Sequence, residues 1–463
     1  MNTHTQLPKL IYFVYNNRML KALLILSIIL SLYSLSFILS GNNFTIHAQQ
    51  DLETIKYRNM VIDLGDGVKT NAQLTIPAVG NGPFPGVLLV AGSGIIDMNE
   101  TLGIVRIDNE TGTKIYPPTR PYFQIAEYLS DRGFVTLRYD KRGIGENSTI
   151  VDSNVWGNLT FNDLKQDAEK ALDVLIQQPE VDAKRITVLG HSEGTVVTPR
   201  VAIDNPDKVK NIVLIGAVAQ NMSKIAELQG VSLPLLYAKE VLDHTHDGLL
   251  SLQEANKNPV FSSWFGNLTL FLTQNITNTA SETTTTNTST PSSSSLSQQL
   301  NPKYNTNNDV YVDIDKELKP RLLENFKSHS VVRPGEKCIG DACPIWQRSE
   351  YALQPNLDII GNVSSNISIL ILQGENDTQT PVQQAFLLQQ KLTELRHPDH
   401  ILITYPNLGH LFYPSSQWQT GIGPIQQYVL ADLYAWLEAH SGLRPLTTSS
   451  SSSYTSNTTK INK

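Results

Sequence analysis

Cysteine is almost absent from this chain: its 463 residues include only Cys338 and Cys343. Two cysteines exclude a disulfide-built fold, and nothing around them resembles a zinc cluster. The two can close a short disulfide loop in an oxidising compartment, and two free thiols are the alternative. A folded core must therefore come from apolar burial, for which the hydrophobic content of 40% is sufficient.

Charge is also scarce. Asp, Glu, Lys and Arg make up only 17% of the residues, and the net charge is −7. No basic run or patch is present in the sequence, so we expect no nucleic-acid partner. The length suits one large domain that carries an insertion.

One long apolar run, Ala22 to Leu39, follows three basic residues near the N-terminus. It is longer than the core of a usual secretion signal and just long enough to span a bilayer. We expect a secretory signal with a cleavage site after Ala48, and an uncleaved anchor is the alternative. In both cases the remainder is exported, so residues 1–48 are an export segment and the only contact with a membrane. The chain's 13 Asn-x-Ser/Thr sequons suit a glycosylated exported protein.

Ser192 lies in Gly190-His191-Ser192-Glu193-Gly194, which has the form G-x-S-x-G. A strand-like run, 185–189, precedes it and a helical stretch follows. Strand, sharp turn and helix in this order hold a serine hydroxyl exposed above a sheet. We therefore predict that Ser192 is a catalytic nucleophile, with a purely structural glycine turn as the alternative.

Two further side chains can complete a catalytic triad. Asp377 follows the strand-like run Ile367 to Leu372, and His410 follows the run Ile401 to Tyr405. A serine hydroxyl is a poor nucleophile near pH 7, so an imidazole must take its proton and a carboxylate must orient that imidazole. We predict these roles for His410 and Asp377, and Glu375 is the rival carboxylate.

An oxyanion-binding loop is expected after the first buried strand. Val87 to Val90 runs into Ala91-Gly92-Ser93-Gly94, whose backbone N–H groups can face a developing oxyanion. We predict the backbone amides of Ser93 and Glu193 as donors, with an ordinary glycine turn as the alternative.

These stretches together resemble an α/β-hydrolase-fold serine hydrolase of the esterase, dienelactone-hydrolase and serine-aminopeptidase type. The resemblance is carried by LLVAGSG (88–94), RYDKRGIGEN (138–147), VLGHSEG (188–194), and GEND with LGH near the end. It implies the triad order Ser, Asp, His. Members usually carry His at the position of Ala91, so a side chain that often braces the oxyanion loop is missing here. Asp140, Lys141 and Arg142 belong to a supporting loop and receive no chemical role.

The predicted fold is α/β: a mostly parallel sheet flanked by helices, with a mainly helical cap insertion. Alternating apolar patterns predict these elements. The expected strands are a hairpin at 57–77 and single strands at 86–90, 134–139, 185–192, 211–215, 367–372 and 401–405. The expected helices are 121–132, 162–178, 194–204, 381–396 and 424–440. The catalytic domain comprises 49–217 and 366–446, the cap 218–365, and 447–463 is a disordered tail.

The cap contains a 12-residue segment, 243–254, that follows the EF-hand calcium-loop template. Its expected oxygen ligands are Asp243, Thr245, Asp247, the backbone of Leu249, Ser251 and Glu254. A second segment, 305–316, aligns to the same template without the turn glycine and the final Glu. We expect structural or regulatory Ca²⁺ at the first loop only. A polar turn between helices is the alternative, and a transition metal at His244 and His246 lacks an evident third ligand.

The Thr-, Ser- and Asn-rich stretch 275–297 cannot bury a core, and we expect a disordered linker there. An apolar cluster just before it, 264–272, can either line an acyl pocket or form cap core.

We predict an exported, cofactor-independent serine hydrolase that cleaves carboxylic esters through an acyl-enzyme intermediate. Its substrate is then a small ester or a short peptide. The alternatives are a serine aminopeptidase or amidase of the same fold, and a non-catalytic module that binds a surface partner in the presence of calcium.

Overall fold

The computed structural model describes residues 54–108, 112–273, 310–329, 344–419, 421 and 423–442. The chain divides into two units, Met1–Glu53 and Thr54–Lys463, and all described residues belong to the second. The predicted export segment, the cysteine pair, the linker and the tail lie outside the described residues. Within the described part of the chain, no helix combines the length and apolar character needed to span a bilayer.

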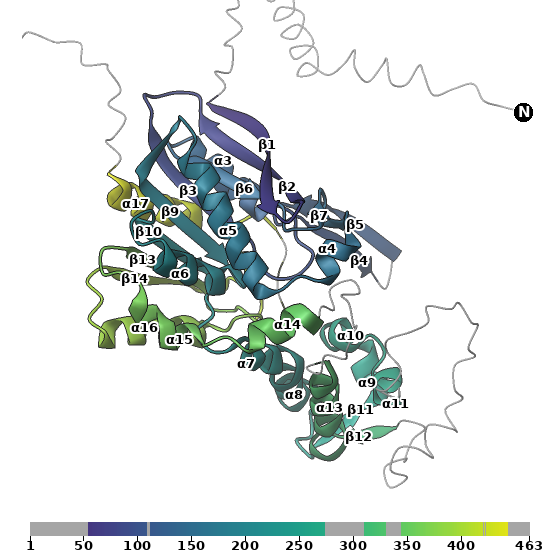
Figure 1. Ribbon diagram of the computed structural model, residues 1–463. Coiled ribbons are helices and arrows are strands. Elements are labelled where there is room, and N and C mark those ends of the chain that lie inside the picture. Colours follow the sequence, from purple (N-terminus) through teal and green to yellow (C-terminus); the bar gives the residue numbers. More distant parts are fainter. Residues whose placement is uncertain are drawn as a thin grey trace, which may run out of the picture. The chain divides into compact units, whose positions relative to one another are not determined.

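An eight-stranded sheet forms the centre of this unit, in the order β1-β2-β6-β3-β9-β10-β13-β14 (Figure 1). β1 pairs antiparallel with β2 and β2 with β6, whereas all later neighbours are parallel. The predicted mostly parallel sheet is confirmed. Its strands are β1 (Ile55–Gly65), β2 (Val68–Pro77), β3 (Phe84–Val90), β6 (Val135–Tyr139), β9 (Val181–His191), β10 (Asn211–Ile215), β13 (Ser368–Gly374) and β14 (His400–Tyr405).

Helices cover both faces of the sheet, which explains why its central strands are apolar throughout. Side chains alternate along β3: Leu88 and Val90 join the core under one set of helices, and Val87 and Leu89 join the core under the other. The first set is α5 (Phe161–Ile176), α6 (Gly194–Asp204) and α16 (Val382–Glu394), and the second is α3 (Pro121–Ser130) and α17 (Gln427–Ser441). Each of these helices begins and ends within a few residues of its predicted range.

The sequence patterns predicted no element between Val90 and Pro121, and the structure has a hairpin there. It consists of β4 (Leu102–Asp108) and β5 (Gly112–Thr119). The segment Tyr116-Pro117-Pro118 explains the omission, because proline argues against a strand unless the strand lies at an edge. Three further short elements were also not predicted: β7 (Ile144–Gly145), β8 (Thr149–Ile150) and α4 (Ser153–Gly157).

The insertion between β10 and β13 has a hydrophobic core of its own, separate from the two cores beside the sheet. Phe261 and Leu268 are fully buried in it, and Trp264, Phe265 and Phe271 pack against it. The apolar cluster at 264–272 is therefore cap core, apart from the exposed Leu270. The elements here are α7 (Met222–Glu227), η1 (Leu228–Ser232), α8 (Leu233–Tyr237), η2 (Ala238–Leu242), β11 (Leu249–Ser251), α9 (Leu252–Lys257), α10 (Pro259–Phe265), α11 (Leu268–Thr273), β12 (Tyr311–Asp313), η5 (Ile314–Leu318) and α13 (Lys319–His329).

The last elements of the insertion belong with the catalytic core. They are α14 (Pro344–Tyr351), α15 (Asn356–Ile359) and the short turn η6 (Ile360–Asn362). Trp346 on α14 and Ile360 are buried in the same core as α5 and α6. α14 also contacts α5 and α7, so it links the insertion to the sheet (Figure 1).

Candidate active site

Ser192 lies at a sharp turn between β9 and α6, as predicted, with a left-handed φ of +54°. Its backbone N–H donates a hydrogen bond of 2.9 Å to the carbonyl of Ile215. Both flanking glycines are required by close backbone approach. A Cβ at Gly190 would lie 2.2 Å from the Gly194 carbonyl oxygen, and one at Gly194 would lie 2.1 Å from the Val90 carbonyl oxygen.

The structure pairs His410 with Asp377. His410 Nδ1 lies 2.7 Å from Asp377 Oδ2, and both side chains are buried. Because a carboxylate only accepts hydrogen bonds, Nδ1 carries the proton and Nε2 is left as a base. Glu375, the rival carboxylate, instead accepts a hydrogen bond from Thr404 Oγ1.

Asp377 is held as an anion. Burial by itself would raise the pKa of its carboxyl, but the electrostatic interaction and hydrogen bond with His410 and the backbone N–H groups of Thr380 and Gln379 lower that pKa below its usual value. Those two N–H groups donate to Oδ1 at 2.9 and 2.8 Å. Gln373 adds a fourth donor, with Nε2 at 2.8 Å from Oδ2. The carboxylate is therefore fixed in position and charge before any substrate arrives.

His410 and Ser192 both lie at the end of β10. Gly216 follows Ile215, and a Cβ on Gly216 would lie 2.9 Å from His410 Cε1. The carbonyl of Ile215, the residue before Gly216, accepts the Ser192 N–H. The His410 imidazole and Ser192 therefore lie next to the same pair of residues, Ile215 and Gly216. His410 Nε2 is buried and has no hydrogen-bond partner among the described residues.

The predicted oxyanion loop lies against the serine. A Cβ on Gly92 would lie 3.2 Å from Ser192 Cβ. Within the described ranges, no hydrogen bond uses the backbone N–H of Ser93 or of Glu193. Both predicted donors are thus available, and Glu193 immediately precedes the first turn of α6, where N–H groups favour negative charge.

Sequence reasoning missed Glu100 and gave His191 no role. Glu100 Oε1 accepts the Gly92 N–H at 2.7 Å and lies 3.0 Å from His191 Nδ1. The imidazoles of His191 and His410 have centroids 4.5 Å apart. No local pattern singles out Glu100, because its partners are distant in sequence or are backbone groups.

Sequence reasoning also missed a buried polar cluster behind the serine. The Glu193 carboxylate binds Lys141 Nζ at 2.7 Å and accepts a hydrogen bond from Trp346 Nε1 at 2.5 Å. Glu350 lies on α14, the same helix as Trp346, and its side chain is also buried. Burial first, and then the charge of Glu193 and a hydrogen bond with it, raise the pKa of Glu350 well above 4.5. Lys141, expected only to lie in a supporting loop, neutralises Glu193, the residue that follows Ser192.

The six predicted calcium ligands extend from Asp243, directly after η2, to Glu254, within α9. Asp243 Oδ2 accepts the Gly248 N–H at 2.8 Å, and Gly248 has a φ of +81°. Ser251 Oγ caps α9 by accepting the Glu254 N–H at 3.2 Å. In the part of the chain that is described, no three or more His, Cys, Asp or Glu side chains are grouped to hold a metal ion.

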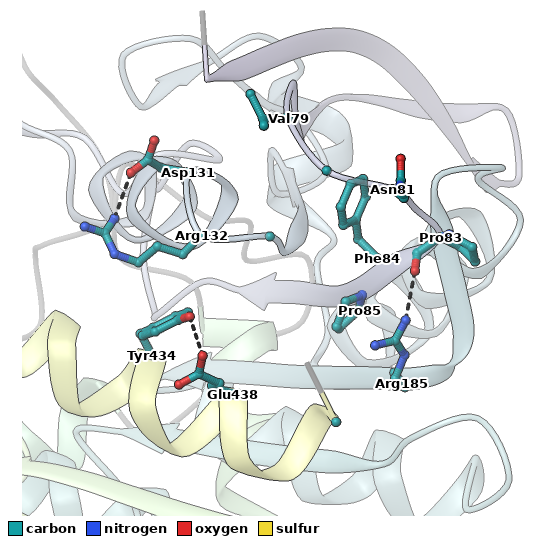
Figure 2. A pocket seen from close by; sticks show the side chains of 13 residues that line it. Val79, Asn81, Pro83, Phe84, Pro85, Asp131, Arg132, Arg185, Tyr434 and Glu438 are labelled. Carbon is teal, nitrogen blue, oxygen red and sulfur yellow. Dashed lines mark hydrogen bonds and ion pairs between the residues drawn. The ribbon is translucent and has the colours of Figure 1, made fainter. Parts of the chain in front are cut away.

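Figure 2 shows a cavity of about 600 Å³ at the amino end of β3. Ser192 follows the carboxyl end of the neighbouring parallel strand β9, so the cavity lies at the opposite end of the sheet. Phe84 and Pro85 line it at the start of β3, with Tyr434 and Glu438 from α17. Several of its polar groups are already paired: Tyr434 donates to Glu438 at 2.8 Å, and Arg185 donates to the Pro83 carbonyl at 2.8 Å. Open α/β sheets place their sites at the carboxyl ends of strands, so we do not assign this cavity a catalytic role.

A parallel sheet with a serine at a strand–turn–helix elbow defines the class of α/β hydrolases. Residues 118–416 match the family described as the alpha/beta hydrolase fold, which is more than half of the chain. The protein therefore belongs to this family.

A similarity to a curated protein covers a shorter part of the chain. Esterase EstD of Thermotoga maritima is 35% identical over 158 residues, which is 34% of this chain and 32% of that protein. The chain thus matches about a third of the length of this relative.

Solved structures are similar at low sequence identity. Est1E from Butyrivibrio proteoclasticus is 13% identical, covering 83% of this chain and 99% of that one, with a TM-score of 0.41. An esterase from Thermogutta terrifontis is 15% identical at the same coverage, with a TM-score of 0.42. A proline iminopeptidase from Mycobacterium smegmatis is 13% identical, again at that coverage, with a TM-score of 0.44.

Proposed function

We propose that the protein is a serine hydrolase that cleaves carboxylic esters through an acyl-enzyme at Ser192. The observation that carries this proposal is the Asp377–His410 pair, which leaves a buried imidazole Nε2 unpartnered among the described residues, beside a serine held at φ +54°. The similarity to Esterase EstD supports the ester as substrate class. The chemistry uses no cofactor, as is typical of this fold family.

The reaction follows from the geometry. His410 Nε2 takes the proton from Ser192 Oγ while the oxygen attacks the ester carbonyl carbon. The N–H groups of Ser93 and Glu193 bind the resulting oxyanion. Its collapse breaks the bond to the alcohol, which leaves with the proton from His410. Water, deprotonated by His410, then attacks the acyl group, and collapse of the second oxyanion releases the carboxylic acid and returns the proton to Ser192.

The test is hydrolysis of p-nitrophenyl acetate, butyrate and octanoate by the full chain and by Ser192→Ala. Ser130→Ala is the matched control, because Ser130 is a buried serine at the end of α3 that bonds to the Thr75 carbonyl. We expect turnover by the wild type and the control and none above background by Ser192→Ala. Equal turnover by all three, or none by the folded wild type, would refute the proposal. In the second case, cleavage of aminoacyl p-nitroanilides would instead indicate an amidase.

We propose further that the first cap loop binds Ca²⁺. The sequence template supports this, and so does the pairing of β11 with β12, which sets Leu250 opposite Val312. These are the eighth positions of the two template segments, where paired loops of this type meet. Addition of Ca²⁺ should raise the melting temperature of the full chain, and Glu254→Gln should abolish the rise. Asp207→Asn, an exposed carboxylate between α6 and β10, should leave it unchanged. A rise that persists in Glu254→Gln would contradict this assignment.

We also propose export, on the basis of the apolar run Ala22 to Leu39 alone. Fractionation of cells followed by N-terminal sequencing tests it. A mature chain that begins near Gln49 outside the cytoplasm supports a cleaved signal, and an intact chain in the membrane fraction supports an anchor. Recovery of the intact chain in the cytoplasm would refute export.

A further inference from the structure

Glu100 is a buried carboxylate at the back of the oxyanion loop. Its side chain is 1% exposed, and its Oε1 atom meets both the Gly92 N–H, at 2.7 Å, and His191 Nδ1, at 3.0 Å. The backbone of Glu100 has a left-handed φ of +52°, which is uncommon for a residue with a side chain. Such a conformation persists only where the surrounding structure fixes it.

The segment that carries Glu100 is held from several sides. Asp97 Oδ1 accepts the N–H groups of Asn99 and Thr101 at 3.0 and 2.9 Å. Asp140 Oδ1 accepts the Met98 N–H at 2.7 Å. These bonds tie residues 97–101 to the end of β6, so the Glu100 carboxylate is presented to the loop in one position.

The carboxylate fixes one side of the loop, and a tyrosine fixes the other. The Tyr122 hydroxyl donates to the Val90 carbonyl at 2.7 Å, while Glu100 accepts from Gly92. These two hydrogen bonds restrain the peptide groups on both sides of Ala91, whose own methyl side chain cannot form a hydrogen bond. The next amide, that of Ser93, is the first one left unused within the described ranges.

Glu100 also orients His191, which lies between it and the catalytic imidazole. Since a carboxylate only accepts, His191 Nδ1 donates to Glu100. A Cβ on Gly92 would lie 3.1 Å from His191 Nδ1 and 3.2 Å from Ser192 Cβ. The loop glycine, His191 and the nucleophile therefore meet around one point, and a displacement of any one moves the others.

We propose that Glu100 is a positioning residue for ester hydrolysis: by holding the Gly92 N–H and His191, it aims the Ser93 amide at the oxyanion. This rests on the function proposed above. An oxyanion donor contributes only when it is in place before charge develops, so the loss should fall on kcat rather than on KM.

The experiment compares Glu100→Ala, Glu100→Met and Glu100→Gln in the full chain with p-nitrophenyl butyrate. Glu100→Ala and Glu100→Met both remove the hydrogen-bond acceptor of the carboxylate, and Glu100→Met does so without leaving a large cavity. Gln keeps an oxygen that can accept from both Gly92 and His191. We expect kcat to fall about 10²-fold in Ala and Met, with KM within about threefold, and to stay within about fivefold of wild type in Gln.

Leu175→Ala is the stability control. Leu175 is fully buried in α5, next to Gly86 at the amino end of β3 and so away from the loop. It should lower the melting temperature without changing kcat by more than about twofold. A second readout is inhibition by an alkyl boronic acid, which mimics the tetrahedral intermediate: its Ki should rise in Ala and Met in step with the fall in kcat/KM.

The proposal is overturned if Glu100→Ala and Glu100→Met keep kcat within threefold of wild type, or if kcat falls as far in Glu100→Gln as in Glu100→Met. It is also overturned if the Ki of the boronic acid is the same in Glu100→Ala and Glu100→Met as in wild type. Absence of wild-type turnover refutes the ester-hydrolase function instead, so the two failures are distinguishable.

Discussion

Replacing Glu350 by glutamine should remove the pH dependence that one buried carboxyl gives to folding stability. Glu350 is 2% exposed, and burial, the charge of Glu193 and a hydrogen bond with Glu193 raise its pKa well above 4.5. The folded protein therefore holds a proton that the unfolded chain releases above about pH 4.5. The associated stability is fully present below that pH and is lost as the pH rises through the folded pKa.

The size of the effect follows from proton linkage. One proton changes the free energy of unfolding by at most about 1.4 kcal/mol per pH unit, until the folded pKa is passed. Glutamine is neutral and can still donate to the Glu193 carboxylate, so Glu350→Gln keeps the hydrogen bond and removes the titration. The variant should match wild type near pH 4.5 and be more stable at pH 8.

Urea unfolding of both proteins at pH 5, 6, 7 and 8 measures this difference directly, because titrations common to the two proteins cancel. Glu324→Gln is the control, since that side chain on α13 is 64% exposed and its difference from wild type should be flat. If the difference in unfolding free energy between Glu350→Gln and wild type does not grow with pH, the conclusion that Glu350 is protonated in the folded protein is refuted.

Three further predictions concern the active site. Asp377→Asn should lower kcat about 10⁴-fold by removing the acceptor that sets the His410 tautomer, whereas Glu375→Gln should leave steady-state p-nitrophenyl butyrate kinetics near wild type. Lys141→Met should reduce the free energy of unfolding by about 3–5 kcal/mol, because it leaves the Glu193 carboxylate buried without its cation; urea titration at pH 7 checks this, and a loss below 1 kcal/mol contradicts it. Gly194→Ala should lower the free energy of unfolding by more than about 3 kcal/mol, because its Cβ would overlap the Val90 carbonyl. A variant as stable as wild type would show that the turn can accommodate a Cβ at this position.

Much of the fold could be predicted because its signals are local. The predicted range 194–204 coincides with α6, and 211–215 coincides with β10, since each apolar pattern ends where a turn residue begins. The β4–β5 hairpin could not be found this way, because two prolines obscure its second strand.

The sequence by itself determined the serine elbow. Gly190 is needed by the backbone of the turn itself, because a Cβ there would meet the Gly194 carbonyl, so this requirement lies in adjacent residues. Gly194 is needed because the Val90 carbonyl of β3 approaches it. The sequence also favoured Asp377 over Glu375, which follows the same strand. Only the tertiary structure shows their partners: Asp377 lies against His410, and Glu375 accepts a hydrogen bond from Thr404.

The contacts behind the serine were likewise decided only by the tertiary structure. Glu193 meets Lys141 and Trp346 across 52 and 153 positions of the chain, and Glu100 meets His191 across 91. No local pattern encodes such pairs, because a buried charge is stabilised by whichever partner the fold brings within hydrogen-bond distance. Local backbone chemistry thus determined where the turn at Ser192 lies, and long-range burial determined which charges surround it.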